Sequence, residues 1–258
     1  MKKKLLAFDI DGTLYDSNKK LLPSSIQAIK ELQAAGHFVT LATGRSLMSS
    51  QEVISELGVE NYILCNGAYA FCQNELTHSF PIDKNELKKV VALANEEQID
   101  ILYQTLDNVK QQGPFIHQRN QEKQEGYSEF KASYEFDIEE EDAIYQAIMF
   151  CDRQTEQLFE PVLDKLRFTR WNEDGLDVIA ATGSKAETLG LIARQQGIAQ
   201  ADIIAFGDGD NDIEMLDYAG LGIAMGNASE TVKRVADDVT ASHDEDGIAL
   251  ALKKYHLI

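Results

Sequence analysis

The chain has 258 residues, of which 44% are apolar, so it can bury a large core in one domain or two. Its 43 acidic and 24 basic residues give a net charge of -19, which argues against nucleic acid or an anionic membrane as a partner. No apolar stretch is long enough to span a bilayer, and the three cysteines lack metal-ligand spacing. We therefore expect a cytoplasmic globular protein with reduced thiols and without a secretory leader.

The first candidate site follows the apolar run Leu5-Leu6-Ala7-Phe8. Such a run is typical of a buried parallel strand, and Asp9 and Asp11 would follow its carboxyl end, where open α/β sheets bind ligands. Residues two apart in an extended segment point the same way, so both carboxylates should face one point and either share a proton or bind a divalent cation. A solvated turn at Asp11-Gly12 is the alternative.

A second predicted strand, at residues 37–42, also ends in small polar residues. Thr43-Gly44-Arg45 follows this strand and precedes a predicted helix at 46–57. The arrangement offers a hydroxyl and the amides of a helix start to a phosphate group. Alternatively, Thr43 and Ser46 only cap the helix.

A third predicted strand, at residues 62–65, leads through Asn66-Gly67 into a hairpin over 69–80. Asn66 would lie at the same end of the sheet as the two clusters before it. Because Asn-Gly is a common turn sequence, we interpret Asn66 as a turn residue.

Residues 82–183 lack this succession of strands and small polar turns, and they are richer in Glu, Gln and Lys. Their apolar spacing predicts a mixture of helices and strands at 84–97, 144–150, 154–166, 167–171 and 176–180. Helices mixed with hairpins indicate an α+β module inserted into an α/β domain. His117 and Arg119 stand in a polar loop of this module, and we assign neither to a site.

The α/β pattern resumes with a predicted helix that Ser184 caps and Gly197 ends. Lys185 lies in the first turn of this helix, where a positive charge is unfavourable to the helix dipole. An anion bound nearby would reverse that cost and would indicate a binding site. Alternatively, the lysine side chain only extends into solvent and binds nothing.

The strongest later cluster follows the apolar run 203–206. Asp208, Asp210, Asn211 and Asp212 lie within five residues, and such crowding of carboxylates is costly unless a cation is bound. Hard oxygen ligands favour Mg²⁺. A calcium loop of the EF-hand type is excluded, because the glycines are misplaced and no glutamate stands at its twelfth position.

Together, four of these clusters resemble the motifs of the haloacid dehalogenase superfamily of phosphohydrolases in the order of that family. The matching segments are Asp9-Ile10-Asp11-Gly12-Thr13-Leu14, Thr43-Gly44-Arg45, Lys185, and Gly207-Asp208-Gly209-Asp210-Asn211-Asp212. The insert between the second and third motifs resembles the C2 (type IIB) cap of the Cof-type subfamily. The resemblance implies a Rossmann-like doubly wound parallel sheet core at 1–81 and 184–258, with an α+β cap at 82–183.

The resemblance also implies residue roles. Asp9 would be the nucleophile that forms an aspartyl-phosphate, and Asp11 the general acid and base. The phosphoryl oxygens would be held by Ile10 through its amide, Thr43, Gly44, Lys185 and Asn211. Mg²⁺ would be held by the Asp9 carboxylate, the Asp11 main-chain carbonyl and Asp208, with Asp212 orienting these ligands.

The implied function is a Mg²⁺-dependent phosphatase that acts on small phosphorylated metabolites, with sugar phosphates the commonest substrates of such relatives. A phosphomutase could use the same two aspartates, and a non-catalytic metabolite sensor could share the fold. The sequence predicts neither the physiological substrate nor the oligomeric state. The segment before Lys185 departs from the usual pattern of the subfamily, which puts the rigidity of the hinge into the cap in doubt.

Overall fold

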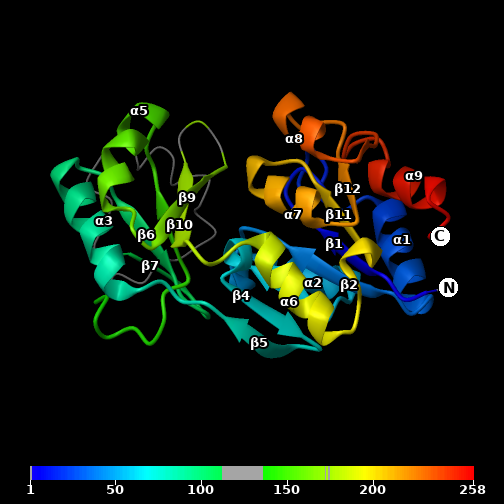
Figure 1. Cartoon of the computed structure of the whole chain (residues 1–258), viewed down its shortest axis with the longest axis horizontal. Coiled ribbons are helices and arrows are strands. Elements are labelled where there is room, and N and C mark those ends of the chain that lie inside the picture. Colours follow the sequence, from blue (N-terminus) through cyan, green and yellow to red (C-terminus); the bar gives the residue numbers. More distant parts are fainter. Residues whose placement is uncertain (1, 112–135, 172, 174) are drawn as a thin grey trace. The chain divides into compact units, whose positions relative to one another are not determined.

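The computed structural model describes residues 2–111, 136–171, 173 and 175–258 (Figure 1). Unit 1 comprises Met1–Arg45, Ser49–Ser79 and Ser184–Ile258, and unit 2 comprises Ser46–Met48 and Phe80–Gly183. The polar-loop residues His117 and Arg119, and the turn residues Asn172 and Asp174, lie outside the described residues.

Unit 1 is built on an eight-stranded sheet with the order β13-β12-β11-β1-β2-β3-β4-β5. Its strands are β1 (Leu5–Phe8), β2 (Phe38–Ala42), β3 (Tyr62–Leu64), β4 (Tyr69–Cys72), β5 (Glu75–Ser79), β11 (Ile203–Gly207), β12 (Leu221–Ala224) and β13 (Asp238–Val239). All pairs from β13 to β3 are parallel, whereas β4 and β5 form the predicted hairpin. The chain leaves β1 toward β2 on one side and returns at β11 on the other, so the topological switch point lies between β1 and β11.

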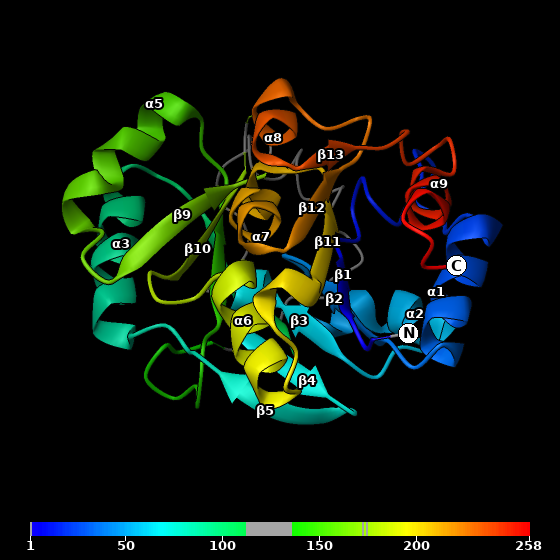
Figure 2. The ribbon, with the colours of Figure 1, turned by 45° about the vertical axis from the view of Figure 1, so that its right-hand side comes forward.

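Helices cover both faces of this sheet. They are α1 (Pro23–Ala34), α2 (Leu47–Leu57), α6 (Lys185–Gln195), α7 (Ile213–Tyr218), α8 (Glu230–Val235) and α9 (Gly247–Lys254). Figure 2 shows α6 and α7 on one side of the sheet and α1 and α9 on the other. On the α6 side, Leu5 and Ala205 pack with Leu189 and Met215 in one buried cluster. The doubly wound α/β fold predicted for this part of the chain is confirmed.

Unit 2 contains an antiparallel five-stranded sheet with the order β7-β6-β8-β10-β9. Its elements are α3 (Lys84–Glu96), β6 (Ile101–Gln104), β7 (Val109–Gln111), β8 (Gln146–Met149), α5 (Arg153–Glu156), a 3-10 helix (Gln157–Val162), β9 (Leu166–Arg170) and β10 (Leu176–Ala180). Leu87 of α3 and Phe159 of the 3-10 helix share a buried cluster with Tyr103 and Val178 of the sheet. The helices therefore cover one face of the sheet, which is the α+β arrangement predicted for the insert.

Two features of unit 2 differ from the sequence prediction. The helix expected at 154–166 is replaced by the short α5 and a 3-10 helix that ends at Val162, because Pro161 cannot donate a backbone hydrogen bond. Strands β6 and β7 were not predicted. All four residues of β6 are buried, so its sequence lacks the alternation that identifies a half-exposed strand.

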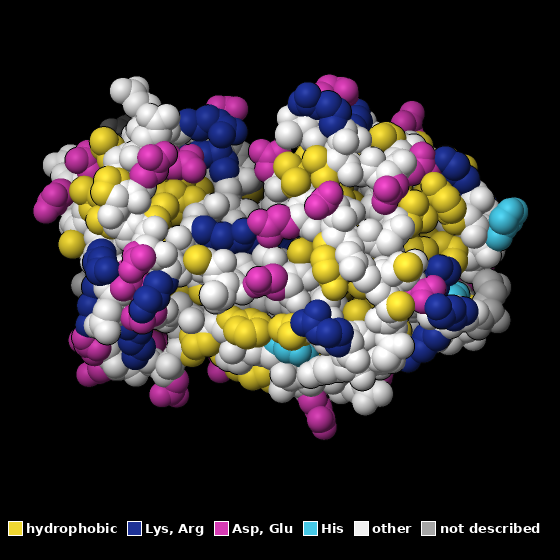
Figure 3. Space-filling view, viewed as in Figure 1, with side chains coloured by type: hydrophobic (Ala, Val, Ile, Leu, Met, Phe, Trp, Pro, Cys, Tyr) yellow, Lys and Arg dark blue, Asp and Glu magenta, His cyan; other side chains and the backbone are white. Residues whose placement is uncertain are grey.

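The surface carries charges of both signs. Figure 3 shows acidic and basic side chains interspersed over the face that it draws, although acidic residues predominate in the whole sequence. Within the described ranges, no helix combines the length and the apolar character that crossing a membrane requires.

Candidate active site

The loop after β1 directs Asp9 and Asp11 to different partners. The Asp9 amide still belongs to the sheet and donates to the Phe206 carbonyl at 3.0 Å. The Ile10 carbonyl then accepts from the amides of Leu14 and Tyr15, so the chain has entered a tight turn. Extended alternation therefore stops at Ile10, whose side chain is fully buried, and the two carboxylates bind different cations, Asp9 binding Lys185 and Asp11 binding Arg45.

Lys185 connects two of the predicted site residues. Ser184 caps α6 by accepting the Glu187 amide at 3.0 Å, as predicted, and so fixes Lys185 at the start of the helix. The Lys185 Nζ donates to Asp9 Oδ1 and to Asp212 Oδ1, each at 2.7 Å. Only 1% of the lysine side chain is exposed, which excludes the alternative that it extends into solvent.

The charge of Lys185 is stabilised by these neighbours. Burial alone would lower the pKa of the ammonium, but the carboxylates of Asp212 and Asp9 outweigh it and raise the pKa above its ordinary value. Lys185 is therefore a permanent buried cation, and its position between two carboxylates is fixed by hydrogen bonds on both sides.

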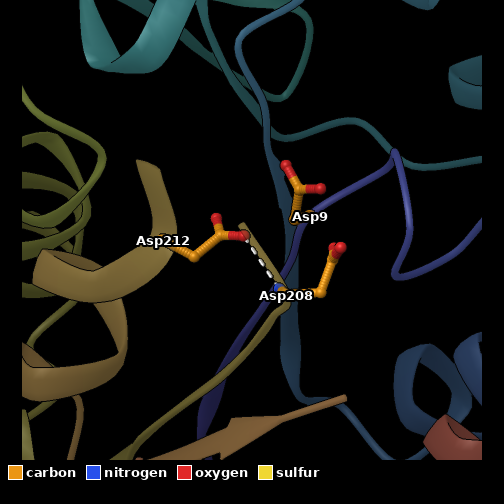
Figure 4. Close-up of side chains that lie close together, drawn as sticks. All are labelled: Asp9, Asp208 and Asp212. Atoms are coloured by element: carbon orange, nitrogen blue, oxygen red, sulfur yellow. Dashed lines mark hydrogen bonds between the residues drawn. The ribbon is translucent and has the colours of Figure 1, made fainter. Parts of the chain in front are cut away.

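Asp212 ties this cation to the loop after β11. Its Oδ2 accepts the backbone amide of Asp208 at 3.0 Å (Figure 4) and that of Gly209, also at 3.0 Å. Its Oδ1 accepts from Lys185. Both carboxylate oxygens of a fully buried side chain are thus engaged. Asp212 consequently fixes the Asp208–Gly209 backbone relative to α6.

Asp9, Asp208 and Asp212 form a cluster of carboxylates in which one oxygen of each lies within 4.8 Å of the others (Figure 4). Burial raises the pKa of Asp9 well above its ordinary value, and the repulsion of Asp212 and Asp208 adds to this effect against the opposing charge of Lys185. Burial, followed by the charge of Asp212, raises the pKa of Asp208 from 3.8 to about 6. Ionisation of all three carboxylates is therefore costly when Lys185 is the compensating positive charge. Carboxylate oxygens are hard donors, which fit Mg²⁺.

Two side chains orient Asp208: Thr13 of the first motif, and Asn227, which the sequence analysis did not single out. The Thr13 hydroxyl donates to Asp208 Oδ1 at 2.8 Å. The Asn227 side-chain amide donates to Asp208 Oδ2 at 3.3 Å and to the Gly12 carbonyl at 2.8 Å. Gly12 has a φ of +78°, and a Cβ there would lie 2.7 Å from Asp208 Cγ, so this close approach of the two loops requires glycine.

Asp11 is held by Arg45 of the second motif. The guanidinium donates from Nε to Asp11 Oδ2 at 2.6 Å and from Nη2 to Oδ1 at 2.5 Å. It also donates to the Ser49 carbonyl at 3.1 Å and lies over the Tyr15 ring at 5.0 Å. The Asp11 side chain is 54% exposed, so this pair is more accessible to solvent than the pair of Asp9 and Lys185.

The predicted phosphate-binding residues follow neighbouring strands. Thr43, buried after β2, accepts the Arg45 amide at 3.2 Å through its hydroxyl. The Asn211 side-chain amide donates to Asn66 Oδ1 at 3.0 Å. A Cβ on Gly44 would lie 3.1 Å from the Asn66 side chain, so Gly44 and Asn211 approach the same asparagine. Sequence analysis had interpreted Asn66 only as a turn residue.

These contacts place the Lys185 ammonium beside the buried Asp9 carboxylate and join Asn211 to Asn66, while Thr43 and Asp9 follow neighbouring parallel strands. Lys185 and Asn211 supply cationic and amide N–H groups, Thr43 supplies a hydroxyl, and Asp9 is the carboxylate. Such an array can bind an anionic group and expose it to a nucleophile. Asp11 lies within the turn that begins at Ile10, and its carboxyl group is chemically suited to move a proton.

Comparisons with known proteins agree with this chemistry. The sequence model of the haloacid dehalogenase-like hydrolase family matches residues 6–252. The chain is 34% identical to YkrA of Bacillus subtilis strain 168, which is provisionally named a phosphatase, with 100% of both chains covered. The phosphatase BT1666 of Bacteroides thetaiotaomicron is 33% identical at a TM-score of 0.91, with 99% of this chain and 96% of that chain covered. The subclass IIB sugar phosphatase BT4131 is 30% identical at a TM-score of 0.88, with 99% and 100% covered.

Proposed function

The chain belongs to the haloacid dehalogenase-like hydrolases, and from this premise we propose that it is a Mg²⁺-dependent phosphatase that works through an aspartyl-phosphate intermediate. Its family makes it a hydrolase of phosphate monoesters on small molecules. The observation that carries the proposed mechanism is the Lys185 ammonium, which is buried between Asp9 and Asp212.

Asp9 is the proposed nucleophile. Lys185 binds Asp9 Oδ1, so we assign the attack on phosphorus to Oδ2. A bond forms between Oδ2 and phosphorus while the bond from phosphorus to the ester oxygen breaks, and the electron pair of that bond stays with the leaving oxygen. Lys185 keeps the carboxylate in one orientation and offsets the charge that gathers on the phosphoryl oxygens.

Asp11 is the proposed acid and base. As an acid, it gives its proton to the leaving oxygen in the first step. In the second step, it accepts a proton from the water that attacks phosphorus, and the bond between phosphorus and Asp9 breaks to release inorganic phosphate. Both Asp11 oxygens accept hydrogen bonds from Arg45, so at least one of these bonds must open before Asp11 can hold the proton.

The phosphoryl oxygens are proposed to bind Thr43, Lys185 and Asn211 together with the backbone amides of Ile10 and Gly44. These groups are held by the sheet and by the start of α6, so they can remain in place while charge develops. Donors fixed in advance of the reaction contribute more to the rate than donors that must reorganise.

The proposed metal ligands are the carboxylates of Asp9 and Asp208 and the main-chain carbonyl of Asp11. Asp212 would orient them through Lys185 and through the backbone of Asp208. When bound, Mg²⁺ neutralises the carboxylate cluster and stabilises charge on the phosphoryl oxygens as a Lewis acid.

We further propose sugar phosphates as the substrate class and unit 2, near residues 82–183, as the cap that selects among them. The subclass IIB sugar phosphatase that matches almost the whole chain supports this choice. A small metabolite as substrate agrees with the net charge of -19, which disfavours nucleic acid. The three buried free cysteines support a cytoplasmic location.

The test is phosphate release from a panel of sugar monophosphates and p-nitrophenyl phosphate, with Mg²⁺ or with EDTA. We expect release by the wild type with Mg²⁺, and none with EDTA or from Asp9→Asn. An active Asp9→Asn variant would refute the nucleophile, and full activity in EDTA would refute the metal ligands. An isomeric sugar phosphate without free phosphate would identify a mutase, and binding without turnover would identify a sensor.

A further inference from the structure

The segment Cys65–Gly67, which we call the 65–67 turn, has an unusual backbone. All three residues have positive φ angles, of +47°, +54° and +99°. Such a run of left-handed residues persists only where the surroundings fix it. Here the Cys65 amide donates to the Arg45 carbonyl at 2.9 Å, and the Asn66 amide donates to the Thr43 carbonyl at 3.0 Å. The turn is thereby attached to the second motif.

The opposite end of the turn is attached to the helix that carries Lys185. The Gly67 carbonyl accepts the Thr188 hydroxyl of α6 at 2.7 Å. A Cβ on Gly67 would lie 2.8 Å from the backbone nitrogen of Lys185, so the turn and the start of α6 are in direct contact. Glycine at this position permits both the left-handed conformation and the close approach.

The side chain of the middle residue, Asn66, contacts two further proposed phosphate-binding groups, Asn211 and Gly44. Asn66 is only 2% exposed. Its Oδ1 accepts from Asn211, and the whole amide group lies against Gly44. One three-residue turn therefore contacts the segments that carry Thr43, Gly44, Lys185 and Asn211, four of the five groups proposed to bind the phosphoryl group.

We infer that Asn66 is a positioning residue for phosphate: it orients the Asn211 amide and the Gly44 peptide, while its neighbours set the distance from Thr43 to Lys185. This inference rests on the proposed phosphatase function and extends it to a residue outside the four motifs. Asn66 acts through Asn211 and Gly44, and it is not itself assigned a bond to the substrate.

Two substitutions of Asn66 distinguish a residue that orients Asn211 and Gly44 from one that only permits the left-handed backbone of the turn. Asn66→Gly keeps the left-handed backbone accessible but removes the side chain that orients Asn211. Asn66→Asp keeps the shape and the acceptor oxygen, and asparagine and aspartate both tolerate positive φ, but it places a negative charge beside the proposed phosphate position. Asn74 is the matched control, because it is a left-handed asparagine in the β4–β5 hairpin.

The measurements are kcat and KM for p-nitrophenyl phosphate, the inhibition constant of inorganic phosphate, and the Mg²⁺ concentration for half activation. We expect each Asn66 variant to lower kcat/KM about 100-fold, as displacement of binding groups does, and to weaken inhibition by phosphate. The Mg²⁺ requirement should stay unchanged, because Asn66 acts through Asn211 and Gly44, and neither of these is a proposed metal ligand. Asn74→Gly and Asn74→Asp should behave as the wild type.

Each outcome decides the inference. If the wild type is active and the Asn66 variants have the same inhibition constant for phosphate as the wild type, the inference is overturned, even if those variants are less stable. A parallel change in the Mg²⁺ requirement would also overturn it, because the effect would then lie in the metal ligands. A wild type that neither hydrolyses the panel nor binds inorganic phosphate by calorimetry would refute the proposed function itself, and the inference with it.

Discussion

Substitution of Lys185 by methionine removes the cation that lies between Asp9 and Asp212 while keeping a side chain of similar length. Loss of one partner of a buried ion pair destabilises a protein by about 3–5 kcal/mol, because the other charge stays buried without compensation. Lys185 has two such partners and is 1% exposed, so we expect Lys185→Met to fall in the upper part of that range. Catalysis should fall by about 10²- to 10³-fold in addition, as loss of a fixed oxyanion donor does.

The assay is urea unfolding at constant Mg²⁺, followed by kinetics under conditions where the variant is folded. Lys254→Met is the control, because its pair with Asp238 is at the surface and its removal should change stability much less. Adding Asp212→Asn to Lys185→Met should recover part of the lost stability, since one uncompensated charge is then removed. A Lys185→Met variant as stable and as active as the wild type would refute this account of the buried cation.

Two further predictions concern the other charged groups of the site. Burial and the charge of Asp212 raise the pKa of Asp208 from 3.8 to about 6, so without metal its contribution to stability is present at about pH 4 and is lost as the pH rises through 6. Thermal unfolding in EDTA should show this loss in the wild type and not in Asp208→Asn; identical pH profiles would contradict it. Arg45→Gln should slow hydrolysis of an alkyl phosphate about tenfold more than that of p-nitrophenyl phosphate, whose leaving group needs no proton. Equal rate losses in steady-state assays would argue against Arg45 as the residue that positions Asp11.

The sequence predicted the parts of the site that depend on strand ends. Asp9 and Lys185 are 176 residues apart, yet each follows from a local rule: Asp9 comes directly after a buried parallel strand, and Lys185 lies in the first turn of a helix, where a nearby anion offsets its unfavourable position. The cap at Ser184 could also be predicted locally, because a hydroxyl oxygen just before a helix can accept a hydrogen bond from a backbone amide of the first turn, here that of Glu187. The family predicted from the four motifs is confirmed, and so is the α/β core with an α+β insert.

Hydrogen bonds and ion pairs that side chains form with other loops could not be predicted from the sequence. Asn227 reaches the Gly12 carbonyl from 215 residues away, and nothing in the spacing of either residue indicates that contact. Asn66 has the ordinary sequence of a turn, and its importance comes from the left-handed backbone that turns its amide toward Asn211. The pairing of Asp11 with Arg45 depends on the residue at which the chain leaves the extended conformation, which is Ile10. The sequence does not indicate the end of the strand to within one residue.

The two carboxylates of the first motif differ chiefly in how firmly their cations hold them. Asp9 and Lys185 are buried, so their attraction is weakly screened and neither group can exchange its partner for water at low cost. Asp11 and Arg45 are 54% and 23% exposed, so water and salt weaken their pair and can replace it. Arg45 would keep its contacts with Tyr15 and the Ser49 carbonyl when Asp11 leaves. The proposed nucleophile, Asp9, needs one fixed orientation, whereas the proposed acid and base, Asp11, must release and accept a proton in each cycle. The same kind of ion pair therefore suits both tasks because the fold buries one of them and leaves the other in contact with solvent.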